Sequence, residues 1–137
     1  MDATHPSTGG VHEAALYVQD LERAERFWAD RIGFPFVARE EGRHVFFRVG
    51  RDMLLLFDAN SSSRQGGRIP AHGAHGPGHV AFDVPDGSAL DAWQRHLEAA
   101  GVEIEHRHEW PNGGRSIYFR DPDGNSIEFI TRGTWGI

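Results

Sequence analysis

The sequence predicts an α+β fold in which one unit, a strand followed by a helix and three more strands, occurs twice along the chain. Alternating apolar and polar residues indicate the strands, and two segments with apolar residues at helical spacing indicate the helices. The same order of elements restarts after a long segment rich in glycine, serine and proline, which is typical of an internal repeat. With 137 residues, the chain has the length of one domain made of two small modules that share a core.

The first βαβββ module is predicted over residues 11–58. Residues 11–18 alternate as a strand does, and Asp20 is a good N-cap for a helix that ends at Gly33. Three more strands are expected over 34–39, 43–49 and 53–57. The polar residues 1–10 before this module are expected to form a loose tail.

The second βαβββ module is predicted over residues 79–137. A strand over 79–84 precedes a helix, which Ser88 is expected to cap and which runs to Gly101. Three further strands are expected over 102–108, 115–120 and 126–130.

A segment rich in glycine, serine and proline connects the two modules. It spans residues 59–78, and its length and composition predict a linker or a lid. Two histidines in it, His72 and His75, raise the idea of a second metal site, but the surrounding glycines favour an exposed loop.

The composition excludes several kinds of function. The 14 basic and 20 acidic residues give a net charge of −6, which argues against nucleic acid or an anionic membrane as a partner. The chain has no cysteine, which excludes disulfides, thiolate metal sites and cysteine nucleophiles. The sequence shows no signal peptide and no apolar run of about 18 residues, so a cytoplasmic location is expected.

The first strands of the two modules align through their distance from the following helix. Glu13 lies seven residues before Asp20. His79 lies seven residues before Asp86. Glu13 and His79 are therefore interpreted as equivalent positions of the repeat.

The last strands align through a shared tripeptide. Residues 46–48, Phe-Phe-Arg, match residues 118–120, Tyr-Phe-Arg. When the alignment continues from there without a gap, Leu56 becomes the counterpart of Glu128.

The strand faces turned away from the helices are expected to carry a mixture of aromatic, apolar and ionisable side chains. By the period of two, Met53, Leu55 and Phe57 are assigned to the helix side. The opposite faces are then expected to carry Glu13, Tyr17, His44, Phe46, Arg48, Leu54, Leu56, His79, Asp83, Ser116, Tyr118, Arg120 and Glu128. Such a mixture is typical of a small-molecule cavity, although a second subunit can also cover a face of this kind.

Several segments together match the pattern of a known superfamily. They are residues 16–22, Phe27-Trp28, 31–34, 78–82 and 121–128. On these residues the chain resembles the vicinal oxygen chelate (VOC) superfamily, which includes glyoxalase I, extradiol dioxygenases, fosfomycin-resistance proteins and bleomycin-resistance proteins. The resemblance implies the glyoxalase/bleomycin-resistance/dihydroxybiphenyl-dioxygenase fold, in which paired βαβββ modules form a cupped mixed sheet.

The resemblance also implies a metal site. Carried over by position, the metal ligands are Glu13, His79 and Glu128, while Leu56 stands where glyoxalase I has a further glutamate. Two carboxylates and one imidazole suit a divalent ion such as Zn, Mn, Ni, Fe or Mg. Glu128 or Glu13 would then be catalytic, as the base that transfers a proton.

Substrate-binding candidates follow from the same faces and from the hairpin loop near residue 115. An arginine there can hold a carboxylate or phosphonate of the substrate, although repeat-equivalent arginines can equally brace the strands. The candidates are His44, Phe46, Arg48, Leu56, Arg115, Tyr118 and Arg120.

Two functions of different kinds are compatible with these residues. The first is a metal-dependent lyase or isomerase of glyoxalase type that acts on a small oxygenated molecule. The alternative is a metal-free protein that binds a small molecule or an antibiotic of the bleomycin kind; extradiol dioxygenase and fosfomycin-type thiol transferase activities are further options. A homodimer is expected, because the modules leave sheet edges and apolar surface to cover, and whether they pair within one chain or between two chains is left open.

Overall fold

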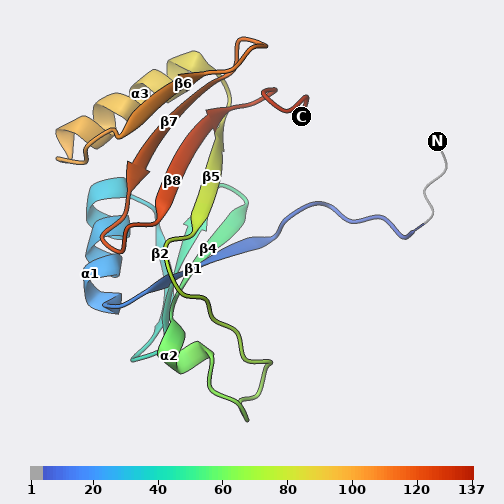
Figure 1. Cartoon of the computed structure of the whole chain (residues 1–137), viewed down its shortest axis with the longest axis vertical. Coiled ribbons are helices and arrows are strands. Elements are labelled where there is room, and N and C mark those ends of the chain that lie inside the picture. Colours follow the sequence, from blue (N-terminus) through green and yellow to red (C-terminus); the bar gives the residue numbers. More distant parts are fainter. Residues whose placement is uncertain (1–4) are drawn as a thin grey trace.

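The computed structural model describes residues 5–137 and confirms the α+β fold (Figure 1). Residues 1–4 of the predicted tail lie outside the described residues, and residues 6–12 contain no helix or strand. The elements are β1 (Glu13–Val18), α1 (Leu21–Arg26), η1 (Phe27–Ile32), β2 (Phe36–Glu40), β3 (His44–Val49), β4 (Asp52–Asp58), α2 (Ala59–Ser62), β5 (His79–Val84), α3 (Gly87–Ala99), β6 (His106–Glu109), β7 (Arg115–Arg120) and β8 (Ser126–Thr131).

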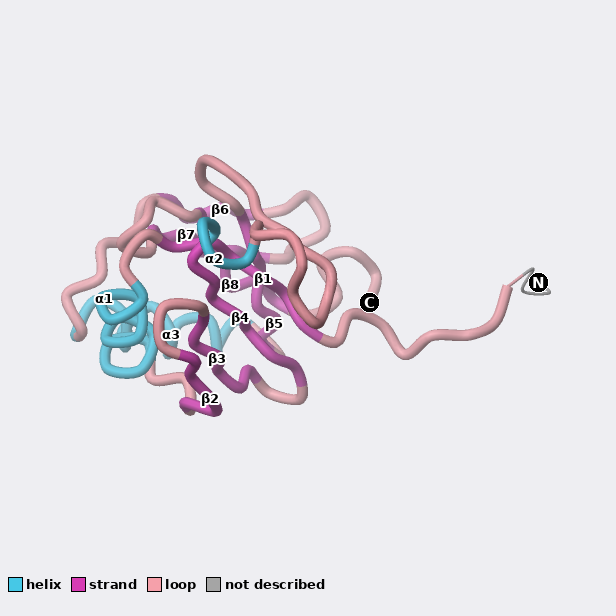
Figure 2. The backbone as a smooth tube through the Cα atoms, turned by 90° about the horizontal axis from the view of Figure 1, so that it is seen from below, coloured by secondary structure: helices cyan, strands magenta, loops and turns pink. Residues whose placement is uncertain are grey.

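The two modules form two sheets with the same topology. Their strand orders are β1-β4-β3-β2 and β5-β8-β7-β6. In each sheet the first strand pairs in parallel with the last, and the other pairs are antiparallel. Strands β1 and β5 are thus both edge strands, and α1 and α3 lie on the same side of the molecule in both views (Figures 1 and 2).

One continuous apolar core lies between the helices and the two sheets. Its largest fully buried side chain, Trp28, packs against Phe82 of the other module with ring centroids 6.0 Å apart. Phe27 likewise contacts Phe119, with centroids 6.4 Å apart. Because the helix-side faces of both sheets are used for this core, the opposite faces remain for a site.

The first helix begins as the sequence predicts and ends in a wider turn. Asp20 accepts a hydrogen bond from the Arg23 amide at 3.0 Å, which confirms it as the N-cap. From Phe27 the helix continues as the π-helix η1 to Ile32, and Gly33 follows as its C-cap with φ of 94°. The left-handed conformation of Gly33 is the expected helix C-terminus.

The second helix is capped two residues earlier than predicted. Asp86, in extended conformation, accepts a hydrogen bond from the Ala89 amide at 2.9 Å, so Asp86 and not Ser88 is the N-cap. Ser88 lies inside α3 because the helix already begins at Gly87.

Several strands begin later in the structure than predicted, including the first, which begins at Glu13 and not at residue 11. The strand predicted over 102–108 begins only at His106, because Val102 and Ile104 instead pack on the core beneath the helix. The strand predicted from residue 34 begins at Phe36, since the Phe34 ring is buried against Trp28. The predicted linker contains the short helix α2 at its start.

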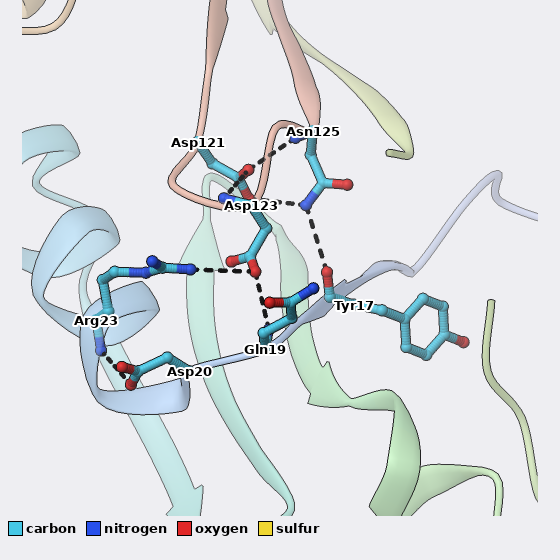
Figure 3. Close-up of polar contacts among 7 residues, drawn as sticks. All are labelled: Tyr17, Gln19, Asp20, Arg23, Asp121, Asp123 and Asn125. Carbon is cyan, nitrogen blue, oxygen red and sulfur yellow. Dashed lines mark hydrogen bonds and ion pairs between the residues drawn. The ribbon is translucent and has the colours of Figure 1, made fainter. Parts of the chain in front are cut away.

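A hydrogen-bonded turn at residues 121–125 joins the modules (Figure 3). Asp121 accepts hydrogen bonds from the amides of Asp123 and Asn125, at 3.0 and 2.8 Å. Asp123 in turn accepts from the Gln19 amide at 2.8 Å, and Arg23 lies 3.4 Å from the same oxygen. The turn that precedes β8 is therefore attached to the end of β1 in the other module.

Within residues 5–137, no helix combines the length and the apolar character that crossing a membrane requires.

Candidate functional site

A histidine and a glutamate of the second module face each other on the open side of the sheet. The Nε2 atom of His79, on β5, lies 3.2 Å from Oε1 of Glu128, on β8. The Nδ1 atom of His79 lies 2.9 Å from the Ser126 carbonyl oxygen. Since a carbonyl oxygen only accepts, Nδ1 donates its proton to Ser126, and this hydrogen bond turns the Nε2 side of the ring toward Glu128.

Glu128 is held in a buried network of hydrogen bonds. It is only 5% exposed, and its Oε2 atom accepts a hydrogen bond from the Ser116 hydroxyl at 2.5 Å. Ser116 itself accepts from the Trp110 indole N–H at 2.9 Å. Burial raises the pKa of the Tyr118 hydroxyl, and the adjacent Glu128 carboxylate raises it further. Tyr118 therefore stays protonated at neutral pH and can donate to an oxygen atom.

The first module has a cavity on the corresponding face of its own sheet. Its volume is about 750 Å³, and Glu13 lies at the start of the edge strand that borders it. The predicted substrate-binding residues His44 and Phe46 line this cavity. Burial lowers the pKa of His44, the Glu40 carboxylate opposes that shift, and Arg43 adds slightly to it. A neutral imidazole is therefore presented to the cavity at neutral pH.

The predicted role of Leu56 is wrong, because Leu56 is fully buried in the helix-side core together with Leu54. Met53, Leu55 and Phe57 line the cavity instead, so the faces of β4 are the reverse of those predicted.

The cause is a difference of one residue between two β-hairpins. Arg48 pairs with Met53, whereas its counterpart Arg120 pairs with Ser126, so the second hairpin is one residue longer. A shift of one residue moves every side chain of a strand to the other face. Leu55, which lies opposite Phe46, is consequently the structural counterpart of Glu128, which lies opposite Tyr118.

The three predicted substrate-binding arginines have different surroundings. Arg115 points to the helix side, where it forms an ion pair of 2.8 Å with Asp91 of α3. Arg120 pairs with Glu105 at 2.9 Å. Arg48 is exposed near the end of β3. Arg115 and Arg120 thus both form ion pairs with acidic side chains, and Arg115 does not lie on the open face of the sheet.

The structure brings His79 and Glu128 together, but not Glu13 with them. Within the described part of the chain, no group of three or more histidine, aspartate or glutamate side chains is arranged to hold a metal ion. A single chain therefore offers a divalent ion two donors, an imidazole nitrogen and a buried carboxylate. Both donors fit such an ion, because each has a hydrogen-bonded neighbour that fixes its orientation.

Several residues of the open faces were missed by the sequence reasoning, among them Leu55 and His72. Leu55 was assigned to the wrong face, and only a comparison of the two hairpin lengths could have revealed it. His72 was interpreted as an exposed loop residue, but it lines the cavity of the first module. The sequence around His72 contains no periodic signal that would have placed it there.

Comparison with known proteins assigns a superfamily to this architecture. The family model of the Glyoxalase/Bleomycin resistance protein/Dioxygenase superfamily matches residues 10–129. The crystal structure of a lactoylglutathione lyase from Agrobacterium tumefaciens is similar, with a TM-score of 0.90, 45% identity, and coverage of 96% of this chain and 99% of that chain.

Two curated proteins are also similar in sequence. The metallothiol transferase FosB of Shouchella clausii (strain KSM-K16) is 42% identical over 89% of this chain and 80% of its own length. The catechol-2,3-dioxygenase of Bacillus subtilis (strain 168) is 28% identical over 98% of this chain. The chain spans only 46% of the length of that dioxygenase.

Proposed function

Because the chain belongs to the glyoxalase/bleomycin resistance protein/dioxygenase superfamily, we propose that it is a metal-dependent enzyme that acts on a small oxygenated molecule. The chemistry we propose is that of a lyase or isomerase of glyoxalase type. The name of one similar protein, a lactoylglutathione lyase, supports this choice, and the name of another, a metallothiol transferase, supports metal dependence.

The observation that carries the proposal is the His79–Glu128 pair. An imidazole whose Nδ1 bonds to the Ser126 carbonyl, and a carboxylate that the Ser116 hydroxyl orients, are typical of ligands prepared for a metal ion. A bound divalent ion would act there as a Lewis acid for the oxygen atoms of a substrate.

A third ligand is available from a second copy of the chain. Glu13 is exposed at the first residue of edge strand β1, and His79 begins edge strand β5. We expect a homodimer in which Glu13 of one protomer completes the His79–Glu128 pair of its partner. Such a dimer would also cover the edges of both sheets.

The remaining polar residues have proposed roles in moving protons. Tyr118, whose raised pKa keeps it protonated, donates a hydrogen bond to a substrate oxygen next to Glu128. Glu13, being exposed, is the carboxylate that can be released to take a proton from the substrate.

The sequence-based predictions of the module boundaries and of a cytoplasmic location stay predictions.

A metal-free binding protein is the second candidate function. The first module has a cavity of about 750 Å³ lined largely by apolar and aromatic side chains, and a pocket of this kind binds small molecules without any metal. Extradiol dioxygenase activity is less well supported, because the ligand set contains only one histidine. Thiol transferase activity is a further option, since one similar protein is named a metallothiol transferase.

The test is metal analysis of the purified protein. We expect about one divalent ion per chain, and loss of most of it in Glu13→Ala, His79→Ala and Glu128→Ala. Glu103→Ala, which removes an exposed glutamate elsewhere, is the matched control and should retain the metal. Full retention in all three site variants would contradict the proposal and favour the metal-free alternative.

Sharing of the site between protomers has a separate test. Refolding an equimolar mixture of Glu13→Ala and Glu128→Ala chains should restore metal to about one quarter of the sites, because half of the dimers are mixed and each has one intact site. If each site is formed within one chain, the mixture binds no metal.

A further inference from the structure

The segment between the two modules is fixed to the rest of the molecule at His72. The His72 amide donates a hydrogen bond to the Ser62 carbonyl at 2.9 Å, and the Ser62 hydroxyl donates to the His72 carbonyl at 2.7 Å. Ser62, at the end of α2, is only 2% exposed. The backbone at His72 is therefore bound on both sides to a buried anchor.

The side chain of His72 is fixed as well. Its Nδ1 atom shares a hydrogen bond of 2.7 Å with the hydroxyl of Tyr17, which lies on β1. The next residue is packed closely, since a Cβ atom at Gly73 would lie 3.2 Å from Cβ of Ser63. Although the sequence predicts a loop here, the His72 side chain therefore has a fixed position next to Tyr17.

That ring completes a continuous row of aromatic side chains, which we call the aromatic arc. His72 packs edge-on against Phe57, with centroids 4.5 Å apart, and lies 5.8 Å from the Tyr17 ring. Phe57 packs against Phe46 at 5.7 Å, and Phe46 stacks on His44 at 3.9 Å. All five rings line the same cavity.

We propose that His72 is a specificity-determining residue of the cavity in the first module, and that the Tyr17–His72 hydrogen bond holds it in the cavity wall. The cavity then selects a small molecule that carries a flat apolar or aromatic group. This inference rests on the proposed function only in assuming that this cavity binds a small molecule, and it needs no metal.

The chemistry of the lining supports this class of ligand. Aromatic rings attract a flat ring through offset or edge-to-face contacts as well as through burial of apolar area. Ala15, Leu55 and Ile69 add apolar surface, whereas Glu13 and Arg43 are the charged residues of the lining. A ligand with one aromatic end and one polar end matches this arrangement.

Binding of N-phenyl-naphthylamine, a neutral aromatic probe that fluoresces in apolar surroundings, tests the proposal. In Tyr17→Phe the ring remains but its hydroxyl is lost, so the dissociation constant should rise about three- to tenfold. His72→Ala should weaken binding at least as much. The double variant should bind no more weakly than His72→Ala alone, because both changes remove the same contact.

Limited trypsin digestion provides a second measurement. The exposed Arg64 and Arg68 lie in the segment that His72 anchors, so Tyr17→Phe should be cleaved there several times faster than the unmodified protein. The probe should slow that cleavage in the unmodified protein. His75→Ala, an exposed histidine of the same segment outside this cavity, should change neither measurement.

Two outcomes would overturn the inference. One is an unmodified protein that does not bind the probe, and the other is unchanged probe affinity in both Tyr17→Phe and His72→Ala. Metal content distinguishes these failures from failure of the proposed function, because Tyr17 and His72 are not among the proposed metal ligands.

Discussion

At the level of single residues, His44 shows how the cavity affects a polar group. Its ring stacks on Phe46, and its buried Nδ1 atom has no hydrogen-bond partner among the described residues. Burial lowers the pKa of His44 and outweighs the opposing effect of the Glu40 carboxylate, whose oxygen lies 3.8 Å from Nδ1. The folded protein therefore binds a proton at His44 less readily than the unfolded chain does.

This difference predicts a pH dependence of stability. Below about pH 6.5, the usual pKa of histidine, the unfolded chain takes up a proton that folded His44 resists, so the free energy of unfolding falls as the pH falls. Replacing His44 with Phe should reduce that fall. The measurement is urea unfolding between pH 5 and pH 8 for the unmodified protein, His44→Phe and, as a control, His75→Phe. Identical pH profiles for the unmodified protein and His44→Phe would contradict the prediction.

At the level of secondary structure, the two helices are stabilised by aspartates at equivalent positions of the repeat. Asp20 caps α1 and Asp86 caps α3, each seven residues after the first residue of its module's first strand. Ser88 follows inside the helix and makes no cap. The repeat therefore extends to the hydrogen bonds that begin the helices.

A pair of alanine variants distinguishes these two candidate caps. Asp86→Ala should lower the free energy of unfolding by about 1 kcal/mol, because the Ala89 amide loses its acceptor. Ser88→Ala should change it by less than about 0.5 kcal/mol, as an exposed helical position does. Chemical denaturation of both variants measures the difference. A larger effect at Ser88 would show that the helix begins later than the structure has it.

At the level of the whole molecule, the modules are joined by a shared apolar core and by the turn before β8 (Figure 3). The side chain of Asp123 is only 7% exposed and accepts the Gln19 amide of the first module. Asn125 accepts a further hydrogen bond of 2.7 Å from the amide of Gly78, the residue before β5. The position of Glu128 on β8 thus depends on contacts with both modules.

Removal of the Asp123 carboxylate should therefore weaken the whole fold. Asp123→Ala leaves the Gln19 amide and Arg23 without their acceptor, and we expect a loss of about 1–3 kcal/mol in the free energy of unfolding. Glu25→Ala removes the ion pair with Arg39, which lies within the first module and is exposed to solvent, and should cost clearly less than Asp123→Ala. Thermal and denaturant unfolding of the two variants compare these effects, and equal losses would count against Asp123 as a link between the modules.

Much of the fold follows from local patterns in the sequence. The period of two places Glu13, His79 and Glu128 on strands, and the distance to Asp20 and Asp86 reveals the repeat. Leu56 shows where such reasoning fails. The match between residues 46–48 and 118–120 is correct. However, the β7–β8 hairpin is one residue longer than the β3–β4 hairpin, so β4 and β8 turn opposite faces at the aligned positions. Hairpin length cannot be read from apolar periodicity.

The sequence by itself determined the α+β class, the two modules, the superfamily and the strands that carry the ionisable residues, because each depends on neighbours along the chain. Only the tertiary structure decided which of those residues meet. In the structure, His79 lies next to Glu128, and Glu13 of the same chain does not lie with them. Arg115 lies on the helix side, where it pairs with Asp91, and His72 lines the cavity of the first module. These outcomes depend on strand register and on contacts between segments far apart in sequence, which local periodicity does not specify.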